Sequence, residues 1–181
     1  GRGGVRLAFN AHLADPQQGL PGLRDWWAAY PYSCLEQTVG QSIGLSDPAQ
    51  WQRTMAQLPT YLDADGLALY FPATDSQRTQ GSDSLTAHLL ALHYAMQGVD
   101  ARFALPAVER ERMESALIAF VQGRIERSHW SPRPDLDVRK LAAVAALAHS
   151  GKARVEMLQS IQLTPTQWPT HALIDWRSIL L

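Results

Sequence analysis

The stretch Tyr30-Pro31-Tyr32-Ser33-Cys34-Leu35-Glu36-Gln37-Thr38 holds the only cysteine of the 181-residue chain. Pro31 cannot continue a helix and favours extended backbone at the residue before it, so a helix over the preceding tryptophans should stop near Ala29. After the cysteine, apolar residues recur at four-residue spacing and predict a second helix: Leu35, Val39 and Ile43. Cys34 therefore lies at or near the N-terminus of this helix, with Gln37 as its neighbour one turn on.

Composition indicates an ordinary globular protein. Hydrophobic residues make up 46% of the chain and charged residues 18%, and 181 residues can bury a substantial core. The formal net charge of −1 gives no electrostatic reason to bind nucleic acid or an anionic membrane surface. No apolar run reaches the length of a membrane-spanning helix. A single cysteine excludes an internal disulfide and a cysteine-based metal site.

Periodicity predicts a mainly α-helical fold after a short N-terminal β-strand. In this strand Val5, Leu7 and Phe9 recur at period two. About seven helices with short links follow, and the main ones are predicted to begin near Leu35, Pro48, Asp83, Pro106, Asp135 or Asp137, Lys152 and Pro165. Between them, residues 63–66 should form a turn and residues 67–71 an extended piece. Helices joined by short links are typical of stacked helical hairpins.

Both ends of the chain indicate a piece of a larger helical domain. The chain opens Gly1-Arg2-Gly3-Gly4 with no visible signal peptide, which is typical of a mid-protein cut or a cloning scar. At the other end, a predicted helix still runs at the last residue without a capping residue, and it carries Leu173, Ile174, Ile179, Leu180 and Leu181. We therefore expect a fragment that is truncated at its C-terminus.

The pairing of Cys34 with Gln37 predicts unusual chemistry. A helix N-terminus favours the thiolate of a cysteine placed there. If the Gln37 carboxamide turns onto the sulfur, loss of ammonia gives an internal thioester, which survives only where water is excluded. Aromatic side chains close by could exclude water, or could equally be ordinary core residues: Trp26, Trp27, Tyr30 and Tyr32.

The stretch around Cys34 closely resembles the thioester signature of the alpha-2-macroglobulin and complement superfamily, in which Cys-x-Glu-Gln is the diagnostic core. It looks most like the bacterial alpha-2-macroglobulins. Three further segments are similar to parts of that family, so the resemblance covers most of the chain: 20–23, 65–72 and 84–92. Ser33 departs from the pattern, because the family most often has glycine before the cysteine.

The resemblance implies a fold and a set of site residues. The fold would be an incomplete α/α toroid of helical hairpins, with residues 1–20 as strand and linker from the preceding domain and residues 21–181 as a truncated thioester domain. Cys34 and Gln37 would be the cross-linked pair, and Tyr30 and Tyr32 would shield their bond. Glu36 belongs to the motif, although its default interpretation is an acid favoured at a helix start.

The resemblance also implies a function in host defence. A protease cleaves a bait region elsewhere in the protein, the thioester becomes exposed, and a lysine of the protease attacks the Gln37 acyl carbon. The protein would thus be a single-use protease inhibitor and not an enzyme. It would be periplasmic and anchored to the inner membrane as a lipoprotein. Its partners would be target proteases, the remaining macroglobulin domains and cell-wall synthesis proteins, with no cofactor, metal or nucleic acid.

Other interpretations stay open from the residues alone. Some thioester proteins pass the acyl group to a histidine, and His129 is the candidate by its place in a loop, although an ordinary histidine is the simpler interpretation. His88 and His93 are five residues apart and do not share a helix face as a metal pair would. Cys34 could instead be an inert residue of a structural helical module, or the nucleophile of a cysteine enzyme. Terpene cyclisation finds little support.

Overall fold

The computed structural model describes residues 22–31, 33–73, 80–127 and 135–180. Within these ranges it contains eight α-helices and three short 3-10 helices. The α-helices are α1 (Leu23–Ala28), α2 (Leu35–Gly44), α3 (Pro48–Gln57), α4 (Asp83–Gln97), α5 (Ala107–Val121), α6 (Leu136–Ala148), α7 (Val155–Leu158) and α8 (Thr170–Leu180). The 3-10 helices are η1 (Leu58–Tyr61), η2 (Ala101–Phe103) and η3 (Pro165–Gln167). The prediction of a mainly helical fold is confirmed.

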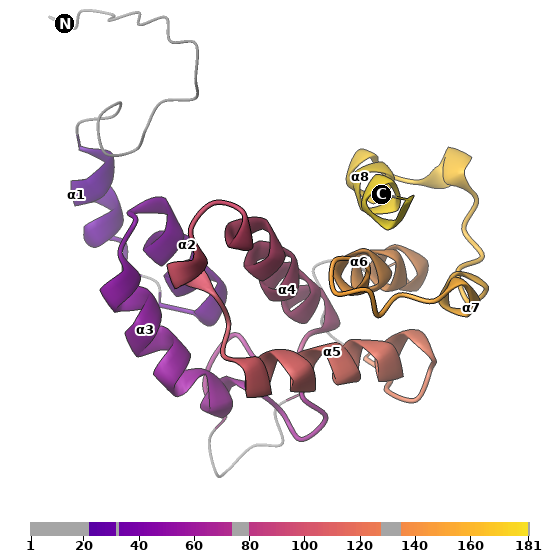
Figure 1. Ribbon diagram of the computed structural model, residues 1–181, viewed down its shortest axis with the longest axis horizontal. Helices are drawn as coiled ribbons and strands as arrows, with labels where there is room; N and C mark the ends of the chain where they lie inside the picture. The colour runs from indigo at the N-terminus through magenta and orange to yellow at the C-terminus, as the bar shows by residue number, and fades with distance from the viewer. Residues whose placement is uncertain (1–21, 32, 74–79, 128–134, 181) are drawn as a thin grey trace, which may run out of the picture.

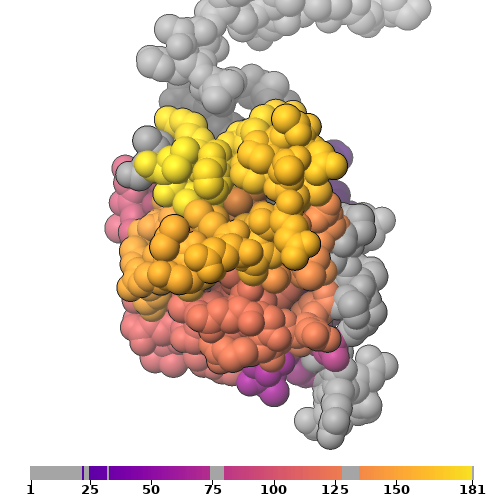
Figure 2. Space-filling model, turned by 90° about the vertical axis from the view of Figure 1, so that its right-hand side faces the viewer, coloured from indigo at the N-terminus to yellow at the C-terminus, as the bar shows by residue number. Residues whose placement is uncertain are grey.

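The helices stack in an open array. α5 packs across both α4 and α6, α2 packs on α3, and α8 packs on the far side of α6 (Figure 1). Figure 2 shows the C-terminal helices lying over α6, with α5 beneath them. The predicted incomplete α/α toroid is not shown by the described residues, and the predicted strand at residues 5–9 lies outside them. No helix in the described ranges is long and apolar enough to cross a bilayer.

A continuous apolar core is shared by α2, α3, α4, α5 and α6. Trp51 of α3 is 2% exposed, and its indole ring meets the Phe103 ring edge-on at a centroid distance of 5.6 Å. The Trp51 Nε1–H donates to the Ala104 carbonyl at 3.1 Å, so the one polar atom of this ring is satisfied inside the core. A smaller cluster holds α8 against α6 around Leu141 and Ala172.

Local capping signals correctly predicted where three helices begin. The Asp47 side chain accepts a hydrogen bond from the Gln50 N–H, and Pro48 opens α3. Ser82 caps α4 through the Leu85 N–H, and the Asp135 side chain caps α6. These contacts span two or three residues, which is why the sequence alone reveals them.

Two helix predictions near the C-terminus are wrong in extent. Residues 152–161 do not form one helix, because the backbone of Arg154 is extended (φ −131°, ψ 147°) and α7 begins only after it. Only the four residues of α7 are helical there. The last helix begins at Thr170, five residues after the predicted Pro165, which belongs to η3 instead.

Candidate functional site

Cys34 is the N-cap residue of α2, as predicted. Its backbone is extended (φ −67°, ψ 158°), its side chain is 7% exposed, and its carbonyl accepts the Thr38 N–H at 2.9 Å. Gln37 is the third residue of the helix and is half-buried. N-cap and third-residue side chains face each other across the first turn, which is the spacing used by a capping box. The backbone thus places Cys34 and Gln37 about one helical turn apart, while Glu36 lies exposed between them.

Residues 67–71 hold the start of α2 in place. The Leu35 N–H, one of the donors that a helix N-terminus leaves without an intrahelical partner, donates to the Tyr70 carbonyl at 2.8 Å. The Tyr70 side chain is half-buried and lies close enough to Glu36 and Cys34 for both to affect its pKa. Burial raises the pKa of Tyr70 above its usual value, Glu36 and Cys34 raise it further, and a hydrogen bond with Ser82 opposes them.

The aromatic residues around the site take different positions. Trp27 packs on Gly44, where an added Cβ would lie 2.7 Å from the ring, and its carbonyl accepts the Gln41 side-chain amide at 2.6 Å. Trp27 therefore lies at the far end of α2, about 13 Å along the helix from its start. Trp26 is 59% exposed and pairs with the half-buried Tyr30 at 5.2 Å between ring centroids. Shielding by Tyr30 stays a prediction, and Tyr32 lies outside the described residues.

The histidines lie on several helices. His93 of α4 is buried, and its Nδ1 accepts the Leu105 N–H at 3.1 Å. Burial lowers the pKa of His93, with Arg110 lowering it further and Glu114 opposing, so the ring is neutral at pH 7. His149 follows α6, and His129 lies outside the described residues. The searched part of the chain contains no group of three metal-binding side chains.

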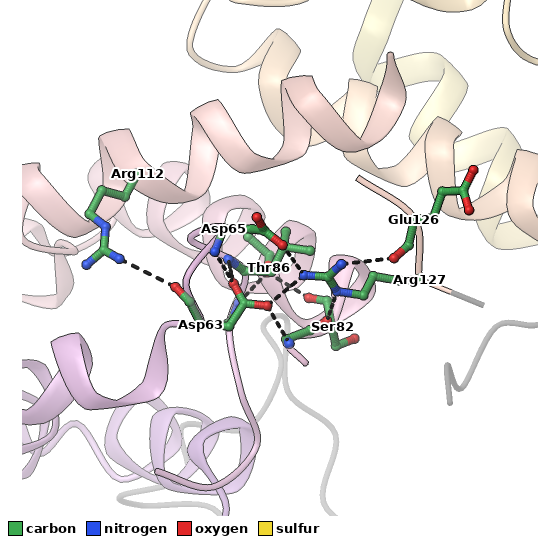
Figure 3. Close-up of polar contacts among 10 residues, drawn as sticks. Asp63, Asp65, Ser82, Thr86, Arg112, Glu126 and Arg127 are labelled. Carbon is green, nitrogen blue, oxygen red and sulfur yellow. Dashed lines mark hydrogen bonds and ion pairs between the residues drawn. The ribbon is translucent and has the colours of Figure 1, made fainter. Parts of the chain in front are cut away.

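A buried ionic network lies at the turn formed by residues 63–66 (Figure 3). The Asp63 side chain is 4% exposed and Arg127 is 11% exposed. The Arg127 Nη2 donates to Asp63 Oδ2 at 2.8 Å and to Asp65 Oδ2 at 2.6 Å, while its Nε donates to the Gly81 carbonyl at 3.1 Å. Burial opposes the charge on Arg127, but the hydrogen bonds to Asp65 and Asp63 outweigh it and raise the pKa of Arg127.

Two further ionic contacts join residues that are distant in the sequence. The Arg139 Nη1 of α6 donates to Asp83 Oδ1 of α4 at 3.0 Å, and both residues are at least 95% buried. The Glu114 carboxylate of α5 is 2% exposed, accepts the Lys152 Nζ at 2.5 Å and also bonds to the Tyr94 hydroxyl. Burial and the bond to Glu114 raise the pKa of Tyr94 to about 12.

Comparison with known proteins identifies the architecture. No protein-family model matches the sequence, and no curated protein does. Among solved structures, the native conformation of E. coli alpha-2-macroglobulin matches with a TM-score of 0.62 at 15% sequence identity. The match covers 86% of this chain and 11% of that chain. The chain has a macroglobulin-like fold.

Sequence reasoning missed two long-range contacts of this fold. Tyr70 lies in the segment 65–72 that resembles the macroglobulin family, but its carbonyl contact with the Leu35 N–H spans 35 residues. Arg127 was not singled out, and it lies 64 residues from Asp63 in the sequence. The buried Asp63 side chain stood in a predicted turn, where an aspartate is ordinary, so no local signal marked its distant partner.

Proposed function

We propose that this chain is part of the thioester domain of a macroglobulin-type protease inhibitor. The observation that carries the proposal is the placement of a buried Cys34 at the N-cap of α2 with Gln37 one turn away. The sequence resemblance around Cys34 and the macroglobulin-like fold support it independently, because one rests on side chains and the other on backbone shape.

The chemistry begins within the chain. The Cys34 sulfur forms a bond to the side-chain carbonyl carbon of Gln37, the carbon–nitrogen bond breaks, and the thiol proton leaves with ammonia. A lysine amine of a captured protease then attacks the same carbon and loses a proton. The carbon–sulfur bond breaks, and its electron pair stays on Cys34 as a thiolate, which the helix N-terminus stabilises. The product is a stable amide, so each molecule acts once.

Burial near the start of α2 would preserve the bond before it is needed. Cys34 is 7% exposed, and Leu35 and Val39 next to it are fully buried. A thioester kept from water reacts only after a rearrangement exposes it. The burial of Cys34 thus suits a stored acyl group that is released by conformational change.

The setting of the whole protein belongs to the same proposal. A bacterial macroglobulin would be a periplasmic protein with a lipid anchor on the inner membrane, acting beside the cell-wall synthesis machinery. Its bait region and remaining domains would be supplied by other parts of the protein, since the matched structure is about nine times longer than the matched segment. Target proteases would be captured covalently, whatever their specificity, as long as they cleave the bait.

The mass of the intact protein tests the thioester. Protein purified without amines should be lighter by one ammonia than its sequence predicts, and methylamine should then release a titratable Cys34 thiol. The Gln37→Ala variant is the matched control: it has no acyl group, so its mass should be unshifted and its thiol free from the start. A wild-type protein with unshifted mass and a reactive thiol would refute the proposal.

A second candidate is a structural helical domain in which Cys34 is inert. The observation that favours it is the burial of Cys34 itself, because a lone buried cysteine ordinarily acts as a small apolar residue. The Cys34→Ala variant separates the two functions. Protease capture is lost if the thioester acts and is unchanged if the domain is purely structural. Repeated turnover of a small substrate would instead indicate a cysteine-nucleophile enzyme.

A further inference from the structure

The Asp63 carboxylate organises the turn at residues 63–66. Its Oδ1 accepts the backbone N–H groups of Asp65 at 3.0 Å and Leu67 at 2.9 Å. Its Oδ2 accepts the Gly81 N–H at 2.7 Å and the Arg127 guanidinium at 2.8 Å. Four donors thus meet one buried carboxylate, and only Arg127 among them carries a positive charge (Figure 3).

Residues 67–70 connect this turn to the helix that begins after Cys34. Hydrogen bonds hold each of the first three residues: the Asp63 N–H donates to the Leu67 carbonyl, the Ala68 N–H to Thr86 Oγ1, the Ser82 N–H to the Ala68 carbonyl and the Leu69 N–H to the Tyr61 carbonyl. Leu67, Ala68 and Leu69 are at most 5% exposed. The fourth residue, Tyr70, accepts the Leu35 N–H. A shift at the Asp63 end therefore has little room to relax before it reaches Leu35.

Close backbone contact makes this connection rigid. A Cβ on Gly81 would overlap the Leu67 carbonyl, so the backbone segments at Gly81 and Leu67 are in direct contact without any side chain between them. Gly66 has φ +94°, and a Cβ there would lie 2.9 Å from the Arg112 carbonyl. The main-chain carbonyl of Arg127 is itself held by the Arg139 Nη1 at 2.7 Å. Arg127 is thereby fixed at both its side chain and its backbone.

We propose that Arg127 is a positioning residue for Cys34, which fixes the start of α2 through the Asp63 turn and residues 67–70. The role of Arg127 in acyl transfer rests on the proposed function, whereas its effect on the geometry at Leu35 does not. Without the guanidinium, the Asp63 carboxylate keeps only neutral backbone donors in a buried place, and the turn rearranges to hydrate it. The Tyr70 carbonyl then moves from the Leu35 N–H, and the buried first turn of α2 opens.

Amide hydrogen exchange at Leu35 in the full-length protein tests this directly. Arg127→Met should raise the exchange rate of the Leu35 amide about tenfold or more, since a hydrogen bond to a charged group is lost at Asp63. Lys152→Met is the matched control, because it also removes a cation from a buried carboxylate, Glu114, but in another part of the fold. It should leave Leu35 exchange within about twofold of wild type.

A milder variant covers the case in which Arg127→Met does not fold. Arg127→Lys keeps the charge but loses the forked contact to Asp63, Asp65 and Gly81, so Leu35 exchange should lie between wild type and Arg127→Met. Equal effects of Arg127→Met and Lys152→Met on Leu35, at matched overall stability, would overturn the proposal. If Arg127→Met does not fold, Arg127→Lys is compared with Lys152→Met instead. The proposal is overturned if the Leu35 amide exchanges no faster in Arg127→Lys than in Lys152→Met.

The reactivity of the site separates this inference from the proposed function. In wild-type protein with a thioester, methylamine should release the Cys34 thiol several-fold more slowly than in Arg127→Lys, with Lys152→Met behaving as wild type. A wild-type mass without loss of ammonia would refute the thioester alone. The rate of Cys34 alkylation and the exchange of Leu35 would then decide the role of Arg127. Unchanged values of both in the Arg127 variants would refute the positioning role.

Discussion

Replacing Arg139 of α6 with methionine should strongly destabilise the fold, because it removes the cation that pairs with the buried Asp83 of α4. Methionine keeps much of the apolar stem of Arg139 but lacks the guanidinium carbon that lies 5.6 Å from the Phe120 ring centre. It removes the partner of Asp83, whose side chain is only 1% exposed. It also removes the hydrogen bond to the Arg127 carbonyl. The carboxylate is then left charged and buried without a cation.

The magnitude follows from this geometry. Removing one member of a buried ion pair costs about 3–5 kcal/mol, because the remaining charge has lost its compensation. For a chain of this size that corresponds to a fall in Tm of about 10 °C. The double variant Asp83→Asn/Arg139→Met removes both charges. It should retain a loss of about 1–3 kcal/mol from the unsatisfied Arg127 carbonyl, well below the sum of the two single losses.

Urea denaturation of the wild type, both single variants and the double variant measures this cycle. The coupling energy between Asp83 and Arg139 should be at least about 2 kcal/mol. Burial raises the pKa of Asp83 even though Arg139 opposes it, and losing Arg139 raises it further. Protonation of Asp83 relieves the buried charge, so the deficit of Arg139→Met should shrink as pH falls from 7 towards 4. Strict additivity, or a deficit that grows on acidification, would refute the reasoning.

Two further outcomes are expected. Gly81→Ala should destabilise the chain by about 2 kcal/mol or more, because the added methyl group overlaps the Leu67 carbonyl. Thermal unfolding measures the loss, and Gly98→Ala is the matched control, since a Cβ at Gly98 meets nothing within 4 Å. Equal losses in the two variants would contradict the close contact at Gly81. Because the pKa of His93 is lowered in the folded state, the unfolded chain binds a proton at this ring more readily than the folded chain. The free energy of unfolding therefore keeps the whole contribution of the neutral ring above about pH 6.5 and decreases as the pH falls through that value. The advantage of wild type over His93→Asn should therefore decline from pH 7.5 to 5, and a constant difference would show that the ring titrates equally in both states.

The sequence predicts the parts of this fold that local contacts decide. The starts of α3, α4 and α6 depend on Asp47, Ser82 and Asp135, each of which caps a helix two or three residues away. The placement of Cys34 at a helix start was equally local, since Pro31 ends one helix and periodicity begins the next.

The features that the sequence did not predict correctly depend on contacts between residues far apart in the chain. The predicted helix over residues 152–161 gave way to a turn in which Lys152 reaches Glu114, 38 residues earlier in the chain. The connection from Arg127 to Asp63 spans 64 residues. Neither contact alters helix periodicity or capping, so single-sequence reasoning has no signal for it.

The cap on α2 has a consequence for comparing related sequences. The acceptor at position 70 is a main-chain oxygen, which every amino acid possesses, so substitutions there could preserve the contact without leaving any pattern in an alignment. Related sequences should instead be restricted at two neighbouring positions. Proline should be absent at position 35, because it would lack the N–H donor, and glycine should be kept at position 81, where two backbone segments are in direct contact. An alignment would thus mark the neighbours of this contact while its acceptor varied freely.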